Sequence, residues 1–184
     1  SFRMEIRKKR LTGSDTTINE TLNEICCSNL QTILEAVPDA RIVISSAWRV
    51  FFTLDWLKAK LQSYGIEGNV VGVTGRTLSG HRGREISEYL QDVEEGLLGT
   101  THTGIQFVVI DDSVGDLQRF AETGNLVATT WKDGLTLEGA EQAIKILGGK
   151  VPTENEMAEE DAKLSEAAKA RREATRPDSK EPNG

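Results

Sequence analysis

The sequence is poor in cysteine, proline and aromatic residues, and the shortage of cysteine excludes whole classes of protein. Cys26 and Cys27 are the only cysteines among 184 residues, and they are adjacent. A disulfide framework and a cysteine-based metal site are therefore excluded. We interpret both residues as core thiols of a reducing compartment and expect a cytoplasmic protein. No apolar run approaches the roughly 20 residues of a membrane helix, so we expect no membrane span.

Basic side chains are fewer than acidic ones. The chain has 22 basic and 29 acidic side chains, which gives a net charge of −7. This balance argues against a nucleic-acid-binding protein without chemistry, even though basic residues crowd the first ten positions. Apolar residues make up 38% of the chain, which is enough for one core and excludes wholesale disorder.

Composition divides the chain into three zones. Residues 1–20 are polar and basic, and residues 21–150 alternate helical and strand patterns. Residues 151–184 hold no Trp, Phe, Tyr or Ile and are dense in charge, so they cannot bury enough surface to pack. We therefore expect one α/β domain over 21–150, preceded by a variable polar segment and followed by a charged tail that is disordered or a frayed helix.

Two patterns of apolar residues alternate along the middle zone, one typical of helices and one typical of buried strands. Helical spacing predicts helices over about 22–37, 53–64, 84–97 and 136–147. Short apolar runs predict strands over 41–45, 70–73, 105–110 and 126–129. Strands that alternate with helices predict a three-layer, Rossmann-like parallel sheet, whose chemistry lies beyond the carboxyl ends of the strands.

Hydroxyl, guanidinium and carboxylate side chains follow the predicted strands in turn. They are Ser45, Ser46 and Arg49 after the first strand, Thr74 and, further on, Arg82 after the second, and Asp111, Asp112 and Asp116 after the third. Carboxylate oxygens bind Mg²⁺, Mg²⁺ and arginine neutralise phosphoryl oxygens, and a hydroxyl donates to them. The combination therefore suits a phosphate group held against Mg²⁺.

Each group also has a purely structural interpretation. Two aspartates after a strand commonly form a turn or cap a helix, and Ser45–Ser46 can cap the helix that follows. Arg49 can be a solvated surface arginine. Arg82 can form an ion pair with Glu85 or Glu88 on its own helix.

The order of the segments resembles motifs two, three and four of the haloacid dehalogenase (HAD) superfamily. The segments that carry the resemblance are Ile42–Arg49, Val71–Thr74, Arg82–Ile86 and Phe107–Asp112. They are most similar to the HAD domain of Swiss Army Knife RNA repair proteins. The resemblance extends over about residues 20–148.

The resemblance implies a Mg²⁺-dependent phosphatase. Ser45 and Arg82 would be catalytic, the first donating to a phosphoryl oxygen and the second stabilising its developing charge. The remaining roles that it implies are substrate binding for Ser46, Arg49 and Thr74, and Mg²⁺ binding for Asp111 and Asp112, with Asp116 in support. The implied substrate is a phosphorylated small molecule or a nucleic-acid end, with RNA and nucleotide phosphate ends as the class that the resemblance suggests.

One motif of the superfamily is missing. Motif one is Asp-x-Asp-Gly at the end of a central strand, and it supplies the nucleophile and the general acid/base. The only acidic residues before the first predicted helix are Glu5, Asp15 and Glu20, and none follows an apolar strand. Without the central strand, the remaining strands should form two pairs with unpaired inner edges.

Two hypotheses follow from this departure. In the first, the sequence begins just after motif one, the complete protein is a phosphatase, and residues 1–184 alone are inactive. In the second, the chain is a non-catalytic HAD-like module that binds phosphate, a metal ion or a partner.

Overall fold

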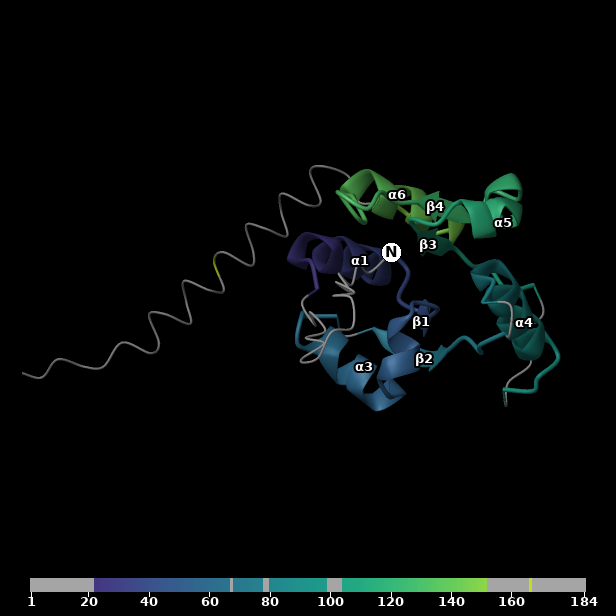
Figure 1. Ribbon diagram of the computed structural model, residues 1–184. Coiled ribbons are helices and arrows are strands. Elements are labelled where there is room, and N and C mark those ends of the chain that lie inside the picture. Colours follow the sequence, from purple (N-terminus) through teal and green to yellow (C-terminus); the bar gives the residue numbers. More distant parts are fainter. Residues whose placement is uncertain (1–21, 67, 78–79, 99–103, 152–165, 167–184) are drawn as a thin grey trace, which may run out of the picture. The chain divides into compact units, whose positions relative to one another are not determined.

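A computed structural model describes residues 22–66, 68–77, 80–98, 104–151 and 166 (Figure 1). The chain divides into a unit of residues 1–150 and a unit of residues 151–184. Of the second unit only Val151 and Glu166 are described, and Glu166 is helical and exposed. The predicted polar segment 1–20 and nearly all of the predicted tail therefore lie outside the described residues.

The helices of the first unit follow the predicted periodicity. They are α1 (Glu24–Ala36), α2 (Trp48–Phe51), α3 (Leu54–Gln62), α4 (Arg82–Glu94), α5 (Gln118–Glu122) and α6 (Leu137–Ile146), with a 3₁₀ turn η1 (Gly115–Leu117) before α5. The four predicted helices correspond to α1, α3, α4 and α6, with ends that differ by at most three residues. Helices α2 and α5 were not predicted, because four or five residues are too few to show a helical period. None of the described helices is long and apolar enough to cross a membrane.

Side-chain caps fix where the long helices begin. The Asn23 Oδ1 atom accepts a hydrogen bond from the Cys26 backbone N–H at the start of α1. Thr53 and Thr136 do the same for α3 and α6. Beyond the end of α3, Gly65 adopts a φ of 79°, a left-handed conformation that favours glycine and ends the helix.

The strands form two separate parallel pairs. They are β1 (Arg41–Ile44), β2 (Asn69–Val73), β3 (Val109–Asp111) and β4 (Leu126–Ala128). In the described part of the chain β1 pairs with β2 and β3 pairs with β4, and no strand joins the two sheets. Figure 1 places β1 and β3 on the inside and β2 and β4 on the outside. The predicted α/β class and the two strand pairs are therefore confirmed.

Strand β3 is shorter than predicted. The apolar run predicts a strand over 105–110, whereas the paired strand covers only Val109–Asp111. The Val109 backbone N–H donates to the Asn125 carbonyl at 2.7 Å, just before β4 begins. Residues 105–108 precede this first ladder bond, and within the described ranges no strand lies along their other edge. The apolar run is present, but its strand partner is not.

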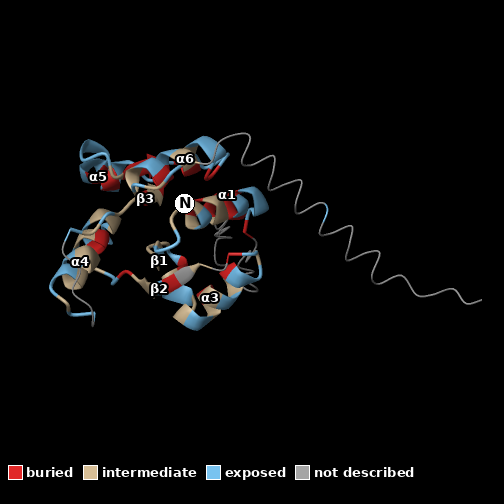
Figure 2. Cartoon of the chain, turned by 180° about the vertical axis from the view of Figure 1, so that it is seen from behind, coloured by how far each residue is buried: buried red, intermediate tan, exposed pale blue. Residues whose placement is uncertain are grey.

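Two groups of buried side chains hold the first unit together. Helix α1 packs against α6; α1 buries Leu30 and Ile33, and α6 buries Ala140, Ala143 and Ile144. A second cluster joins α4 to β3, η1, α5 and β4 through Ile86, Val109, Leu117, Phe120 and Leu126. Figure 2 shows buried stretches along one side of these helices and exposed stretches along the other. Both predicted core thiols, Cys26 and Cys27, are buried and free.

Candidate functional site

The candidate site lies at the first turns of α4, beside the carboxyl ends of three strands. The Arg82 Nη1 atom lies 2.6 Å from the Asp111 Oδ2 atom at the end of β3. One turn later, Glu85 forms an ion pair with Arg49, which follows β1. The Glu85 Oε1 atom also accepts from the Thr77 backbone N–H at 2.9 Å, just after β2. Helix α4 therefore gathers the carboxyl ends of β1, β2 and β3 at one edge.

Asp111 is fixed by two hydrogen bonds. Its side chain is 4% exposed, its Oδ2 atom accepts from Arg82, and its Oδ1 atom accepts from the Ser113 backbone N–H at 2.9 Å. Hydrogen bonds between charged groups in a buried setting are the strong ones. The ion pairs of this structure differ from the alternative in which Arg82 pairs with Glu85 or Glu88, because Glu85 pairs with Arg49 and Glu88 with Arg84.

The partners of Arg49 in this structure are a carboxylate and backbone carbonyls, whereas the resemblance implies a substrate phosphate. Its side chain is 8% exposed, and it donates to the backbone carbonyls of Ser45, Ser46 and Thr74 as well as to Glu85. Burial lowers the pKa of the Arg49 guanidinium, and the charge of Glu85 opposes that shift. In this structure the guanidinium of Arg49 therefore contacts groups of its own chain. It fixes the turn after β1 against the end of β2.

The hydroxyl groups line the polar end of a cavity. Ser45, Ser46, Thr74 and Asp111 all contribute to the wall of a cavity of about 1010 Å³. Thr74 is buried, and its Oγ1 atom has no hydrogen-bond partner in this structure. The Ser46 Oγ atom accepts from the Trp48 backbone N–H at 3.3 Å, in the turn before α2, whose N-cap residue is Ala47.

The three aspartates do not form the cluster that was predicted. Among the residues the structure describes, no group of three or more His, Cys, Asp or Glu side chains could hold a metal ion. Asp116 is exposed, and its Oδ1 atom lies 3.6 Å from the His81 Nδ1 atom. Carboxylate oxygens are the ligands that Mg²⁺ prefers, so Asp111 and Asp112 suit the ion chemically. Among the described residues Asp116 does not join them in a group of three, and its exposed side chain lies near His81.

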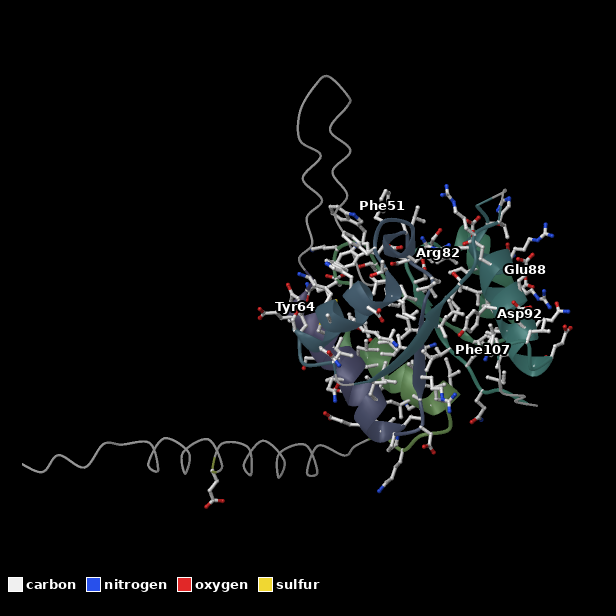
Figure 3. All side chains as sticks on the ribbon, turned by 90° about the horizontal axis from the view of Figure 1, so that it is seen from below. Phe51, Tyr64, Arg82, Glu88, Asp92 and Phe107 are labelled. Atoms are coloured by element: carbon white, nitrogen blue, oxygen red, sulfur yellow. The ribbon has the colours of Figure 1, made fainter. Side chains whose placement is uncertain are left out.

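Glu85 is the site residue that sequence reasoning missed. The prediction treated it only as a surface partner of Arg82, whereas its side chain is 2% exposed. The available signal was its position next to Ile86 on the apolar stripe of α4, which continues through Tyr89 and Leu90. Figure 3 shows Arg82 on the side of α4 toward the strands, and Glu88 and Asp92 on its outer side.

Comparison with known proteins gives one match. The family described as "HAD domain in Swiss Army Knife RNA repair proteins" matches residues 3–140. No curated protein and no solved structure matches the chain. The matched range includes Ser45, Arg82 and Asp111.

Proposed function

Because the chain belongs to the family of HAD domains found in Swiss Army Knife RNA repair proteins, we propose that it serves as the HAD domain of a phosphatase acting on phosphate monoesters. One observation carries this proposal. Ser45, Thr74 and Asp111 line the same cavity, and Arg82 reaches Asp111 from the start of α4. A hydroxyl, a guanidinium and a carboxylate are thereby brought to one edge of the strands, where parallel sheets carry their chemistry.

The reaction we propose has two displacement steps. An aspartate of a strand that completes the sheet attacks phosphorus, the bond to the ester oxygen breaks, and an aspartyl-phosphate forms. Water then attacks that phosphorus, the bond from phosphorus to the aspartate oxygen breaks, and inorganic phosphate and the free carboxylate are released. The Ser45 hydroxyl donates to a phosphoryl oxygen, and Arg82 stabilises the charge that develops there. Arg49 acts as a positioning residue, because its bonds to the Ser45 and Ser46 carbonyls fix the turn that carries the hydroxyl.

Mg²⁺ is part of this proposal. The carboxylates alone would repel a phosphate dianion, and a bound divalent ion reverses the local field. Asp111 and Asp112 would supply oxygen ligands from this chain. Asp116 is left out of the proposed set, since it is exposed and lies against His81.

The substrate class we propose is a phosphorylated nucleic-acid end, with a small phosphorylated molecule as the other candidate. The description of the family supports RNA. The competing function is a non-catalytic binding module. It is favoured by the absence from residues 1–184 of an Asp-x-Asp pair that follows an apolar strand.

The test is to supply the missing strand covalently. An apolar strand that ends in Asp-x-Asp is fused ahead of residue 1, and phosphate release is measured from 4-nitrophenyl phosphate and from 3′- and 5′-phosphorylated RNA. We expect Mg²⁺-dependent release from the fusion and none from residues 1–184 alone. Arg82→Ala should lower kcat by about 100-fold or more, which is typical for loss of a charge-stabilising donor. Arg84→Ala, on the outer side of the same helix, serves as the control.

Two results would contradict the proposal. The first is specific turnover by residues 1–184 without the added strand, since these residues carry no suitable nucleophile. The second is Mg²⁺-dependent release that persists unchanged in Asp112→Asn, since the proposed metal set would then be wrong.

A further inference from the structure

Two aromatic side chains of the first unit are exposed. Phe51, in α2, is 57% exposed, and Trp131, in the turn after β4, is 64% exposed. The other described phenylalanine, tyrosine and tryptophan side chains are buried or half-buried. A single exposed apolar side chain needs no explanation. These two, however, lie at the edge of the strands that carries the candidate site.

Trp131 follows the strand that lies beside Asp111. In the register of the second sheet Asp111 lies opposite Ala128, and the Thr129 backbone N–H donates to the Asp111 carbonyl at 2.9 Å. Trp131 comes two residues after Thr129. The turn that carries Trp131 therefore begins at the carboxyl end of β4, next to Asp111.

Phe51 lies at the same edge, beyond the end of β1. Two residues before it, the Arg49 guanidinium donates to the Ser45 carbonyl after β1 and to the Thr74 carbonyl after β2. Figure 3 shows Phe51 and Arg82 toward the same end of the first unit. Because β3 lies between β1 and β4 (Figure 1), the two exposed aromatic rings belong to segments on either side of the β3 exit.

The turn that carries Trp131 is held in one shape by its own hydrogen bonds. The Thr130 hydroxyl donates to the Asp133 Oδ2 atom at 2.9 Å and accepts from the Asp133 backbone N–H at 3.0 Å. The Gly134 backbone N–H donates to the Thr130 carbonyl at 2.9 Å, and Gly134 has a φ of 63°, a left-handed conformation that favours glycine. Trp131 and Lys132 lie at the tip of this closed turn. An aromatic side chain on a fixed backbone loses little conformational freedom when a ligand stacks on it.

The side chains at this edge match the chemistry of a single nucleic-acid strand. Every nucleobase has a flat face on which an aromatic ring can stack, and lysine and arginine neutralise backbone phosphates. Lys132 is next to Trp131 and is exposed, as is Arg76 beyond the end of β2. A purely apolar partner would have to bury these two charges unpaired, which is costly. The two aromatic rings and two cations therefore favour a strand of nucleotides with unpaired bases.

We propose that Trp131 and Phe51 stack on unpaired bases of a single-stranded RNA end whose phosphate enters the candidate site, and that Lys132 binds its backbone. This inference rests on the proposed function for the nature of the substrate. It goes further by requiring unpaired nucleotides next to the phosphate, because protein side chains stack on bases that are splayed out of a helix. A phosphorylated small molecule without a base would lack these contacts.

The experiment measures RNA binding by residues 1–184, for which no turnover is expected. The probe is a single-stranded hexaribonucleotide with a phosphate at each end. Fluorescence anisotropy of a labelled copy and quenching of tryptophan emission follow its binding. Trp131→Ala and Phe51→Ala should each weaken binding about fivefold or more, the lower end for loss of one base stack.

Two further variants serve as controls. Trp131→Phe keeps a ring for stacking, so it should retain most of the affinity while the quenching of tryptophan emission is lost. Leu97→Ala is the matched control for an exposed apolar side chain. Leu97 is 68% exposed and lies beyond the other end of α4, so its replacement should leave RNA binding unchanged.

Two further probes and one variant test the chemistry of the contact. An abasic hexamer has the same backbone and phosphates but no bases, and a blunt duplex of the same sequence has its bases covered. Each should bind at least fivefold more weakly than the single strand, since one lost stack already gives this factor. Lys132→Gln should lower the slope of log Kd against log salt concentration by about 0.7, the value for one phosphate contact on a single strand.

Three results would overturn the stacking role. One is binding of the abasic hexamer as tight as that of the hexamer with bases, and another is equal affinity of the Trp131→Ala and Leu97→Ala variants for RNA. The third is the absence of saturable binding by the unmodified chain. An unchanged salt slope in Lys132→Gln would remove Lys132 from the contact.

The covalent fusion described above separates this inference from the proposed function. If residues 1–184 bind single-stranded RNA through Trp131 but the fusion releases no phosphate, the stacking role stands and the phosphatase is contradicted. If the fusion releases phosphate from RNA ends with the same kcat/KM whether position 131 is Trp or Ala, the stacking role of Trp131 is overturned and the phosphatase stands.

Discussion

At the residue scale, Glu85 and Arg49 form a buried pair of opposite charges. Both side chains are less than a tenth exposed, and between them they contact the exits of β1 and β2. Such pairs add little net stability over apolar residues of the same shape, but removal of one partner leaves an uncompensated buried charge. The pair therefore acts as a constraint on the geometry of the site.

We expect Glu85→Gln to lower the free energy of unfolding by about 3 kcal/mol, the low end of the usual range for breaking a buried pair, since the amide can still accept from the Thr77 N–H. Urea denaturation measures this loss. Glu88→Gln on the same helix breaks an exposed pair and should cost about 0.5 kcal/mol or less. Equal losses for the two variants would contradict the role given to Glu85.

Cys27 gives a pH dependence to the stability of the protein. Burial raises the pKa of its thiol to about 11 from an ordinary value of 9.0, with smaller contributions from Cys26 and Glu24. The unfolded chain loses this proton first as pH rises. The stabilisation is therefore complete below pH 9 and is lost as the pH rises toward about 11. We expect Cys27→Ala to flatten the fall in the free energy of unfolding between these two values, measured by denaturation at each pH. An unchanged slope would show that Cys27 does not titrate in this window.

At the element scale, the placement of α4 against η1 determines where Arg82 lies. Gly83, in the first turn of α4, approaches the backbone of η1 so closely that an added Cβ atom would lie 2.2 Å from the Asp116 carbonyl oxygen. That atom belongs to the backbone and cannot turn aside. Glycine at position 83 therefore permits the approach that brings Arg82 to Asp111.

We expect Gly83→Ala to push α4 away from η1 and to lower the free energy of unfolding by about 1–3 kcal/mol, as overpacking does. It should also weaken the Arg82–Asp111 pair. Gly115→Ala is the matched control, because an added Cβ atom there meets nothing within 4 Å. Thermal denaturation of the two variants measures the difference. Equal melting temperatures would show that the η1 backbone moves aside for the added Cβ atom at little cost in stability.

At the scale of the whole molecule, the first unit is two small sheets joined by helices. Helix α1 packs on α6, and α4 contacts η1 while holding the exits of three strands. No described strand joins β1 to β3. Among the described residues, the helices and the two ion pairs therefore connect the halves.

The buried apolar core of the described residues lies between Leu22 and Ile144. We therefore expect deletion of residues 152–184 to shift the melting temperature by less than about 2 °C, since ~1 kcal/mol moves a domain of this size by about 2–4 °C. Differential scanning calorimetry compares the shortened and full chains. A drop of 5 °C or more would show that the second unit contributes to the core.

The sequence by itself determined the order of the four longer helices and the four strands, and its resemblance to a family implied the two strand pairs. Apolar periodicity, the cap at Thr136 and the absence of an Asp-x-Asp strand are local features. Local features can be identified from the order of the residues alone. The sequence also identified Ser45 and Asp111 as candidates, because each lies directly behind an apolar run, and Arg82 through the resembled motif.

Only the tertiary structure decided which of these groups touch. It paired Arg82 with Asp111, buried Glu85 beneath Arg49, and placed Asp116 against His81. These contacts join residues 29 to 36 positions apart or depend on the packing of α4 against η1, and no local pattern encodes such distances. The length of the paired part of β3 was likewise decided by the strand beside it, because a strand exists only where a neighbour supplies the other half of its hydrogen bonds.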